Sequence, residues 1–343
     1  GKKIRTENLK AEPSFNTNDI IILTCDENYR GNTKVPLTNK KLYLYLKKGT
    51  KILADDGTLS FKVDKVVKNG DIVLNKNGIK YIQWDPDNSM LDISHVRNLY
   101  SIINLAGESI DGSRWTSRYK RKILESRVNS LKLLQSKVSQ LSKLPESFVS
   151  ASATGYYQEN TPKPQNELDL PGENFLSKVV IEWEKEMKKF DKIGVRTVVL
   201  RIGLVLSRRG GVLKKLYPLF KFFLGVPIGS GKQIISWIHE KDMVDVIIKA
   251  VENTNFSGKF NVVAPERVTN TEFTKSLLKT LGRFSYPNFV KAPSFVIKII
   301  FGEQSKLVLN GLNVSSKKLS AKYQFKFPEL DSALGEIFKR NNL

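Results

Sequence analysis

The 343-residue sequence predicts an α/β fold built around a doubly wound parallel sheet. Two observations carry this prediction. From about residue 99 onward, short apolar runs alternate with stretches of helical periodicity. The run VRTVVLRIGLVL at 195–206 is apolar almost throughout, which is typical of a parallel strand buried on both faces. An all-β, barrel-like part is expected before this sheet, at 1–75, and a small helical part after it, at 266–343.

The elements follow one another in a consistent order. β-branched runs separated by turn residues predict the early strands, and recurring apolar positions at spacings of three and four predict the helices. The expected strands are 19–26, 51–63, 70–75, 99–107, 147–153, 195–206 and 258–264, and the expected helices are 117–141, 173–190 and 240–252.

The charge is high but evenly spread. Lys and Arg number 56 against 34 Asp and Glu, a formal charge of +22, and 14 of the cations are Arg. Binders of specific nucleic-acid sequences favour clustered Arg, so no specific nucleic-acid partner is expected. No apolar run reaches about 18 residues, so no membrane span is expected.

Cysteine and histidine are scarce. One Cys and two His far apart in the chain argue against a Cys- or His-based metal site, and no metal is expected. The basic, polar start does not resemble a signal peptide, so secretion is not expected. A cytoplasmic and a plastid-type location both stay open, as does the oligomeric state.

Three local motifs have structural interpretations. GVPIGSGKQ at 225–233 resembles a phosphate-binding loop, but Val226 replaces the required Gly, so we interpret it as a turn. Asp55 and Asp56 precede Gly57 between two β runs and predict a hairpin turn. Asp242, near His239, precedes a helical run and predicts an N-cap.

A series of hydroxyl groups marks the end of one expected strand. Ser147, Ser150, Ser152, Thr154, Tyr156 and Tyr157 fall within SFVSASATGYY. Seven different motifs lie along the chain in a fixed order: IQWDPDNSMLD (82–92), INLAGESI (103–110), KILESRVNS (122–130), VSASATGYY (149–157), LRIGLVLSRRGGVL (200–213), GSGKQIISWIHEKDMV (229–244) and GKFNVVAPERVTNTEF (258–273). Through these motifs, residues from about 81 to 343 resemble an atypical extended short-chain dehydrogenase/reductase subgroup, an NAD(P)-dependent epimerase-like family.

This resemblance implies a Rossmann-like sheet, NADP or NAD as cofactor and an unidentified small-molecule substrate. Asn104, Leu105, Ala106 and Gly107 would line the cofactor, together with Ser150, Ala151 and Arg201. Ser152 would hydrogen-bond the reacting carbonyl, where charge develops during hydride transfer. Tyr156 is the candidate proton donor.

The chain departs from the usual enzymes at two places. Phe175 occupies the expected Tyr position and Val179 the expected Lys position, and neither side chain transfers a proton. In the usual enzymes a glycine-rich loop holds the cofactor's phosphates, and the stretch before residue 78, where it is expected, does not contain one. We therefore expect a truncated sheet without its first two strands. An epimerase-like oxidoreductase and a non-catalytic binding protein both stay open.

Residues 1–75 resemble a different family, the lid (B) domain of pyruvate kinase. GKKIRTENLK (1–10) and GTKILADDGTLSFKV (49–63) carry this resemblance, which implies roles for Arg5 and Asp56 near a nucleotide. It makes the chain a chimera with domains 1–75, 76–265 and 266–343. It also raises a third alternative, a pyruvate kinase fragment, although the catalytic Lys and metal ligands of that enzyme are missing from the sequence.

Overall fold

The computed structural model describes residues 20–24, 35–36, 44, 46, 50–54, 59–66, 71–76, 82–94, 96, 98–284 and 291–339. The chain divides into two compact units, residues 1–82 and 83–343. Arg5, Asp55 and Asp56 lie outside the described residues, so the predictions made for them are not tested. The further division of the second unit at residue 265 also stays a prediction.

The described residues of the first unit form a five-stranded sheet. Its strands are β1 (Ile20–Thr24), β2 (Val35–Pro36), β3 (Lys51–Ala54), β4 (Leu59–Val66) and β5 (Asp71–Lys76), in the order β2-β1-β5-β4-β3. All neighbours are antiparallel except β1 and β2. The strands described in this unit thus form one β-sheet, in line with the β-rich pattern of the sequence.

The second unit begins with a small hairpin and contains a parallel sheet of four described strands. The hairpin pairs β6 (Trp84–Asp85) with β7 (Met90–Leu91). The sheet has the order β14-β10-β9-β8, from β8 (Ser101–Asn104), β9 (Ser147–Ala153), β10 (Arg196–Ile202) and β14 (Gly258–Val262). All three pairings are parallel, which confirms the α/β fold class.

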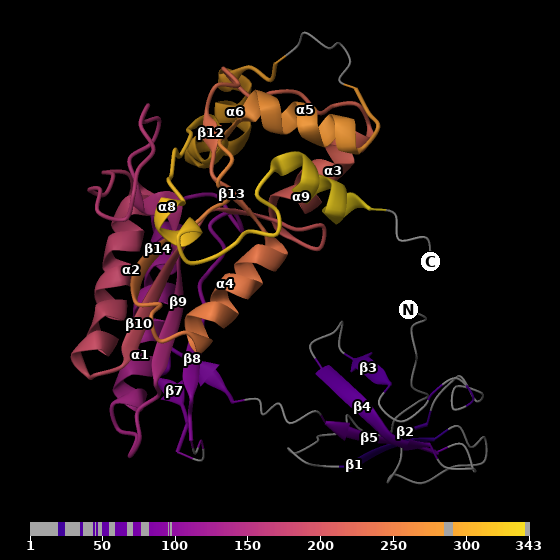
Figure 1. Ribbon diagram of the computed structural model, residues 1–343, viewed down its shortest axis with the longest axis vertical. Helices are drawn as coiled ribbons and strands as arrows, with labels where there is room; N and C mark the ends of the chain where they lie inside the picture. Colours follow the sequence, from indigo (N-terminus) through magenta and orange to yellow (C-terminus); the bar gives the residue numbers. More distant parts are fainter. Residues whose placement is uncertain are drawn as a thin grey trace. The chain divides into compact units, whose positions relative to one another are not determined.

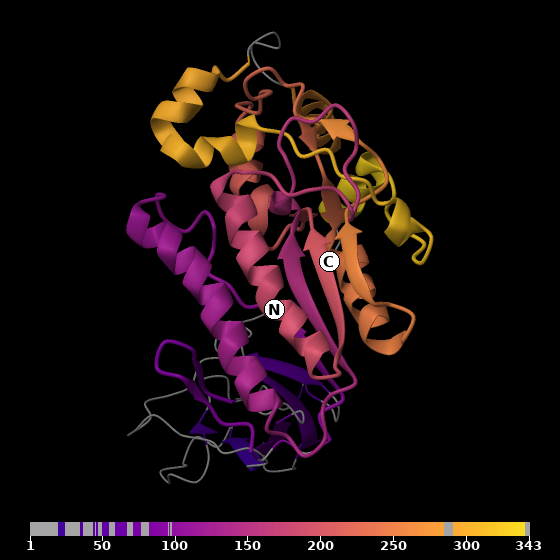
Figure 2. The same cartoon turned by 90° about the vertical axis from the view of Figure 1, so that its left-hand side faces the viewer.

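The sheet is covered on both faces, as a doubly wound sheet requires. In Figures 1 and 2, α1 (Ser117–Val138) and α2 (Phe175–Lys192) cover one face and α4 (Glu240–Glu252) covers the other. Between the two layers, Phe148 of β9 stacks on Phe190 of α2 at a ring-centroid distance of 3.9 Å. Both rings are fully buried.

Local signals set the helix boundaries. Thr116 caps α1 by accepting from the Tyr119 amide at 3.2 Å, and Asn174 caps α2 by accepting from the Ser177 amide at 2.9 Å. After α2 the chain turns at Gly194 with φ +86°, where a side chain would be strained.

The long apolar run at 195–206 is two strands rather than one. β10 ends at Ile202, and β11 (Leu204–Leu206) pairs with β13 (Trp237–His239) outside the main sheet. The break lies at Gly203, where an added Cβ would come 2.5 Å from the Ser236 carbonyl oxygen. The close approach of a neighbouring chain segment therefore divides a run that is continuous in its hydrophobicity.

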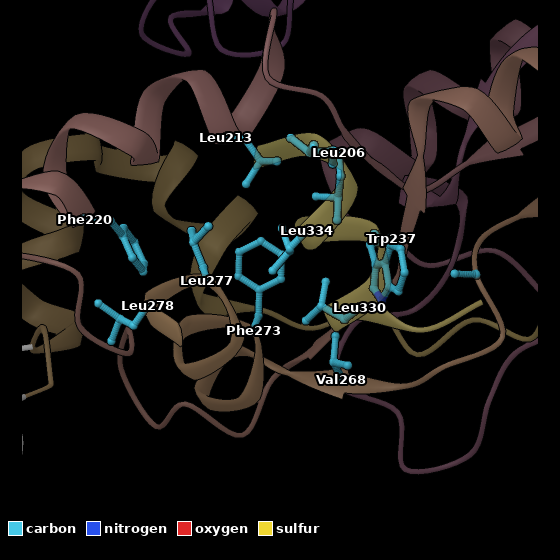
Figure 3. Close-up of a cluster of buried hydrophobic side chains, with 13 residues drawn as sticks. Leu206, Leu213, Phe220, Trp237, Val268, Phe273, Leu277, Leu278, Leu330 and Leu334 are labelled. Atoms are coloured by element: carbon cyan, nitrogen blue, oxygen red, sulfur yellow. The ribbon is translucent and has the colours of Figure 1, made fainter. Parts of the chain in front are cut away.

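The helical C-terminal part packs against these outer strands. It contains α3 (Gly211–Lys221), α5 (Asn270–Thr280), α6 (Ser294–Phe301), η4 (Gly302–Ser305), α7 (Lys306–Leu309), α8 (Lys317–Ser320) and α9 (Leu330–Phe338), and the pair β12 (Ile234–Ile235) and β15 (Val268–Thr269). In Figure 3, Phe273 lies among Leu277, Leu330 and Leu334. The same core includes Trp237 of β13, so it extends across the predicted boundary at residue 265.

Two distant segments are tied together beside this core. The Asn160 amide donates to the Gly311 carbonyl, and the Gly311 amide donates to Oδ1 of Asn160, both at 2.8 Å. The Gln165 amide donates to the Asn313 carbonyl at 2.8 Å, and the Ser315 amide donates to the Gln165 carbonyl at 2.8 Å. We call this pairing the clasp.

At the opposite side of the sheet, β8 has one partner strand, β9, within the described residues. Ile103 of β8 is 49% exposed. The expectation that the sheet lacks its first two strands stays a prediction. None of the helices in the described residues has the length and apolar character needed to cross a membrane.

Candidate active site

A cavity of about 400 Å³ lies at the carboxyl ends of β9 and β10. Its sheet side is formed by residues 153–155, at the end of β9, and 202–204, at the end of β10. Doubly wound sheets bind their ligands at this edge. The other walls come from α1, α2 and the C-terminal part: Ile110, Arg127, Leu176, Val179, Val180, Trp183, Val212, Leu216, Phe220, Val226, Ile228, residues 233–236, Asn270, Phe273, Thr274, Leu307, Val308, Asn310 and Leu312.

The α2 wall is apolar where the usual enzymes carry their Tyr and Lys. Val179, the residue at the expected Lys position, lines the cavity. Phe175 does not belong to the lining and packs edge-on against Trp115 with ring centroids 5.2 Å apart. Leu176 lines the cavity instead. With Phe175 and Val179 at the expected Tyr and Lys positions, α2 offers no group there that transfers a proton.

Ser152 belongs to a buried polar network beneath the cavity. Its hydroxyl donates to Oε1 of Glu184 at 2.8 Å. Arg201 donates to the same carboxylate through Nε at 2.8 Å and Nη2 at 2.9 Å. Because a serine hydroxyl has one proton, Ser152 cannot donate to Glu184 and to a substrate carbonyl at the same time.

Glu184 is ionised within this network. Burial alone would raise the pKa of its carboxyl, but the hydrogen bond and charge of Arg201 outweigh burial and lower it. Lys259, 3.0 Å from Oε2, adds a second positive charge. Arg201 itself is fully buried. Its observed partners are protein groups, so the contact with a cofactor that the resemblance implies stays a prediction.

The two tyrosines after β9 join the same network. Nη1 of Arg201 donates to the Tyr157 hydroxyl at 2.9 Å, and that hydroxyl donates to Oδ1 of Asn261 at 2.7 Å. Burial raises the pKa of Tyr157 to about 12. The ring of Tyr156 lies 3.4 Å from the central guanidinium carbon of Arg201. Neither tyrosine lines the cavity, and the acid role of Tyr156 stays a prediction.

A different hydroxyl lines the cavity. Thr154, the first residue of η3 (Thr154–Tyr156), is buried in the lining, and its Oγ1 lies 3.4 Å from the carbonyl oxygen of Ile202. This contact is long for a hydroxyl donor. The sequence motif contains Thr154 as well as Ser152. In an extended strand these two residues lie on the same face, so the sequence could not show which of them reaches the cavity.

The turn after β8 has a defined geometry. The Asn104 side chain donates to Oγ of Ser150 at 2.9 Å and accepts from the Ala106 amide at 3.3 Å. A Cβ at Gly107 would meet the guanidinium carbon of Arg127 at 3.0 Å. The first bond joins the turn to β9, and the nearby guanidinium of Arg127 from α1 leaves little room for a side chain at Gly107.

Two other residues singled out by the sequence have structural partners. The predicted N-cap Asp242 is wrong: His239 caps α4, accepting from the Lys241 amide at Nδ1, 3.0 Å away. Asp242 lies buried in the first turn and accepts from the Tyr323 hydroxyl at 2.7 Å and the Lys326 amide at 2.8 Å. It therefore anchors the segment that leads to α9.

A second cavity, of about 460 Å³, lies close to the first and shares Gln233 and Ile234 with it. Its lining is more polar and includes the exposed cations Lys232 and Arg267. The described residues contain no cluster of three or more His, Cys, Asp or Glu that could hold a metal ion.

The chain is similar in sequence to known proteins. The profile of the NAD dependent epimerase/dehydratase family matches residues 73–263, and a domain of unknown function, DUF1731, matches residues 292–337. An epimerase family protein of Staphylococcus aureus strain N315 is 32% identical over 277 residues, which cover 80% of this chain and 90% of that protein. The epimerase family protein SDR39U1 of Mus musculus is 36% identical over 242 residues, covering 69% of this chain and 81% of the relative.

Solved structures agree with the sequence relatives. Human SDR39U1 (isoform 2), crystallised with NADPH, matches with a TM-score of 0.65 and 32% identity, covering 71% of this chain and 82% of that one. A nucleoside-diphosphate sugar epimerase from Corynebacterium glutamicum matches with a TM-score of 0.59 and 28% identity, covering 74% of this chain and 49% of that one. These comparisons lend no support to the pyruvate kinase resemblance of residues 1–75 or to a chimera.

Proposed function

Because this chain belongs to the NAD dependent epimerase/dehydratase family, we propose that it binds NADPH or NADH and that the 400 Å³ cavity is its reaction site. The observation that carries the proposal is the position of this cavity at the carboxyl ends of β9 and β10. Ligands of doubly wound sheets bind there. NADPH is present in the crystal structure of the human relative SDR39U1.

The residues around the cavity fit the nicotinamide half of such a cofactor. Gly107 lets the backbone after β8 run close to its neighbours, and the small residues Ala153 and Gly155 leave room above β9. The diphosphate half would need a glycine turn at a helix N-terminus, and no α-helix is described ahead of α1. The proposal therefore assigns residues to the nicotinamide half alone.

A bound nicotinamide would supply hydride transfer to a carbonyl carbon, or would accept hydride from the carbon of the corresponding alcohol. The proton that the oxygen gains or loses would be exchanged with water. The apolar α2 wall would keep water from the reacting carbon, and a hydroxyl of the chain would orient the reacting oxygen. We assign that orientation to the Thr154 hydroxyl, since the proton of Ser152 is engaged by Glu184. Ser152 and Arg201 then act as positioning residues, because they fix the end of β9 relative to α2.

The test is a titration with NADPH, monitored by energy transfer from tryptophan to the reduced nicotinamide. Trp183 lines the cavity and Trp84 lies in β6, 37% exposed. We expect saturable transfer, a large part of which is lost in Trp183→Phe and retained in Trp84→Phe. Absence of saturable transfer up to about 1 mM NADPH, where binding would be worth only about 4 kcal/mol, would contradict the proposal.

Position and turnover can be tested separately. Thr154→Val removes the hydroxyl that lines the cavity with little change in volume, and Ser152→Ala removes the hydroxyl bonded to Glu184. With a carbonyl substrate that is turned over, we expect Thr154→Val to lower kcat while NADPH binding is kept. An equal loss of NADPH binding in both variants would instead favour a non-catalytic binding protein whose network only maintains the fold.

A further inference from the structure

We propose that the cavity accepts an apolar carbonyl compound, of the type of an aliphatic ketone or aldehyde, in preference to a nucleotide sugar. The inference deepens the proposed function, on which it rests, by naming the substrate class of the same cavity. Three features carry it: the lining is mostly apolar, its polar side chains are already hydrogen-bonded to protein, and the volume is small.

Apolar side chains form most of the lining. They come from α2, α3, α5 and α7 as well as from the strand ends: Leu176, Val179, Val180, Trp183, Ile202, Leu204, Val212, Leu216, Phe220, Phe273, Leu307, Val308 and Leu312. Among the described residues of the lining, Arg127 carries the only charge. Such a surface gains free energy from burying hydrocarbon, and offers little to a ligand with several charges.

The polar side chains of the lining hold its walls together. Nε2 of Gln233 donates to the carbonyls of Ile228 and Val308, both at 3.0 Å. Oδ1 of Asn270 accepts from the Ile228 amide at 2.7 Å. Nδ2 of Asn310 donates to Oε2 of Glu159 at 2.7 Å. A nucleotide sugar would have to break such bonds, or bury its own hydroxyls and phosphates without partners, at a cost of several kcal/mol.

Arg127, the cation among the described lining residues, also has partners in the protein. Nη1 of Arg127 donates to the carbonyls of Glu108 at 3.0 Å and Ile123 at 2.9 Å, and its guanidinium lies over the Trp183 ring at 5.0 Å. Thr154, with its long contact to Ile202, is the hydroxyl least committed to protein. A ligand with a single polar oxygen therefore matches this lining.

The volume of the cavity also favours a small apolar ligand. A volume of about 400 Å³ is near the lower end of the range for small-molecule sites, about 300 to 1,000 Å³. If the nicotinamide ring enters the same cavity, the space left for substrate is smaller still. A compact hydrocarbon with one carbonyl fits this space better than a sugar joined to a nucleoside diphosphate.

The test is calorimetric titration of the full chain, without cofactor, with the 2-alkanones from 2-pentanone to 2-nonanone and with UDP-glucose. Each added methylene should tighten binding about fourfold until the cavity is filled, because each buried CH₂ contributes about 0.8 kcal/mol. An affinity that does not change with chain length, or UDP-glucose binding more tightly than 2-nonanone, would overturn the inference.

Matched variants locate the binding. Val308 lines the cavity and is 37% exposed, whereas Val244 on α4 is 47% exposed and does not line it. Val308→Trp should weaken 2-nonanone binding about tenfold or more, and Val244→Trp should leave it unchanged. Equal effects of the two substitutions would contradict binding in this cavity.

A second pair of variants addresses the nucleotide-sugar alternative. Lys232→Gln and Arg267→Gln remove the exposed cations of the neighbouring cavity and should leave alkanone binding unchanged. UDP-glucose binding that is abolished by them would favour the nucleotide sugar. Saturable NADPH transfer without alkanone binding would refute this inference alone, and alkanone binding without NADPH binding would refute the cofactor proposal alone.

Discussion

The substitution Glu184→Gln should destabilise the protein strongly. It keeps the shape of the side chain but removes the only carboxylate within ion-pair distance of Arg201 among the described residues. Arg201 is fully buried and Glu184 is 7% exposed, so water cannot replace the lost charge. The guanidinium would remain in the interior with no anion.

The magnitude follows from this burial. Removal of one partner of a buried ion pair costs about 3 to 5 kcal/mol, because the remaining charge is left uncompensated. Domains of this kind have a free energy of unfolding of about 5 to 15 kcal/mol. With a urea dependence of about 3 kcal/mol per molar, the midpoint of unfolding should fall by about 1 M or more.

Urea unfolding followed by circular dichroism measures the effect, and α2 supplies a matched control. Lys185 pairs with Glu182 on its surface, with side chains 62% and 49% exposed. Lys185→Gln should cost less than about 1 kcal/mol, since exposed pairs contribute little. A loss in Glu184→Gln as small as in this control would refute the reasoning. The double substitution of Glu184 and Arg201 by Met should be less destabilising than Glu184→Gln alone.

Acid gives an independent check of the same pair. The folded-state pKa of Glu184 is lowered, so the unfolded chain binds a proton more readily. This contribution to stability is complete above the unfolded carboxyl pKa of about 4.3 and is lost as the pH falls through the folded value. Glu184→Gln should therefore remove part of the acid sensitivity below about pH 4.3.

Two further predictions concern His239 and helix α9. Burial lowers the pKa of His239, although the nearby carboxylates of Glu336, Asp242 and Glu240 act in the opposite direction. The neutral ring therefore stabilises the fold fully above the unfolded pKa of about 6.5, and this stabilisation is lost as the pH falls through the folded pKa. The drop in Tm between pH 8 and pH 5.5 should therefore be smaller in His239→Gln than in the original protein, and an equal drop would show that His239 does not cause it. Leu334 of α9 is fully buried in the core of Figure 3, so Leu334→Ala should lower the free energy of unfolding in urea by about 2 to 5 kcal/mol. The control Leu219→Ala, at a 48% exposed position, should change it by about 0.5 kcal/mol or less. Equal losses in the two variants would argue that α9 is not part of the core.

Local patterns predicted the α/β layout well. The helix expected at 240–252 coincides with α4, and the helix expected at 173–190 overlaps α2. Each of these helices has apolar residues at helical spacing and a capping residue at its start. These signals are local in the sequence, so the sequence alone predicts the helices. The break at Gly203 was missed because it depends on Ser236, which belongs to a later segment.

The candidate site was predicted less completely, for the same reason. The motif at 149–157 pointed to the strand end at which the cavity lies, but the partner of each hydroxyl depends on distant residues. Ser152 is bonded to Glu184 and Tyr157 to Asn261, 32 and 104 residues away. No spacing within the motif could show that Ser152 is engaged below the cavity while Thr154 lines it.

The clasp has a consequence for how the protein is made. Asn160 emerges from the ribosome 151 residues before its partner Gly311, a delay of about 8 to 30 s at ordinary rates of translation. Until then the nascent loop after β9 lacks the hydrogen bonds that hold it, and the wall contributed by residues 307–312 does not yet exist. The cavity can therefore close only after residue 312 has been synthesised, so its assembly follows the synthesis of all four described strands of the parallel sheet.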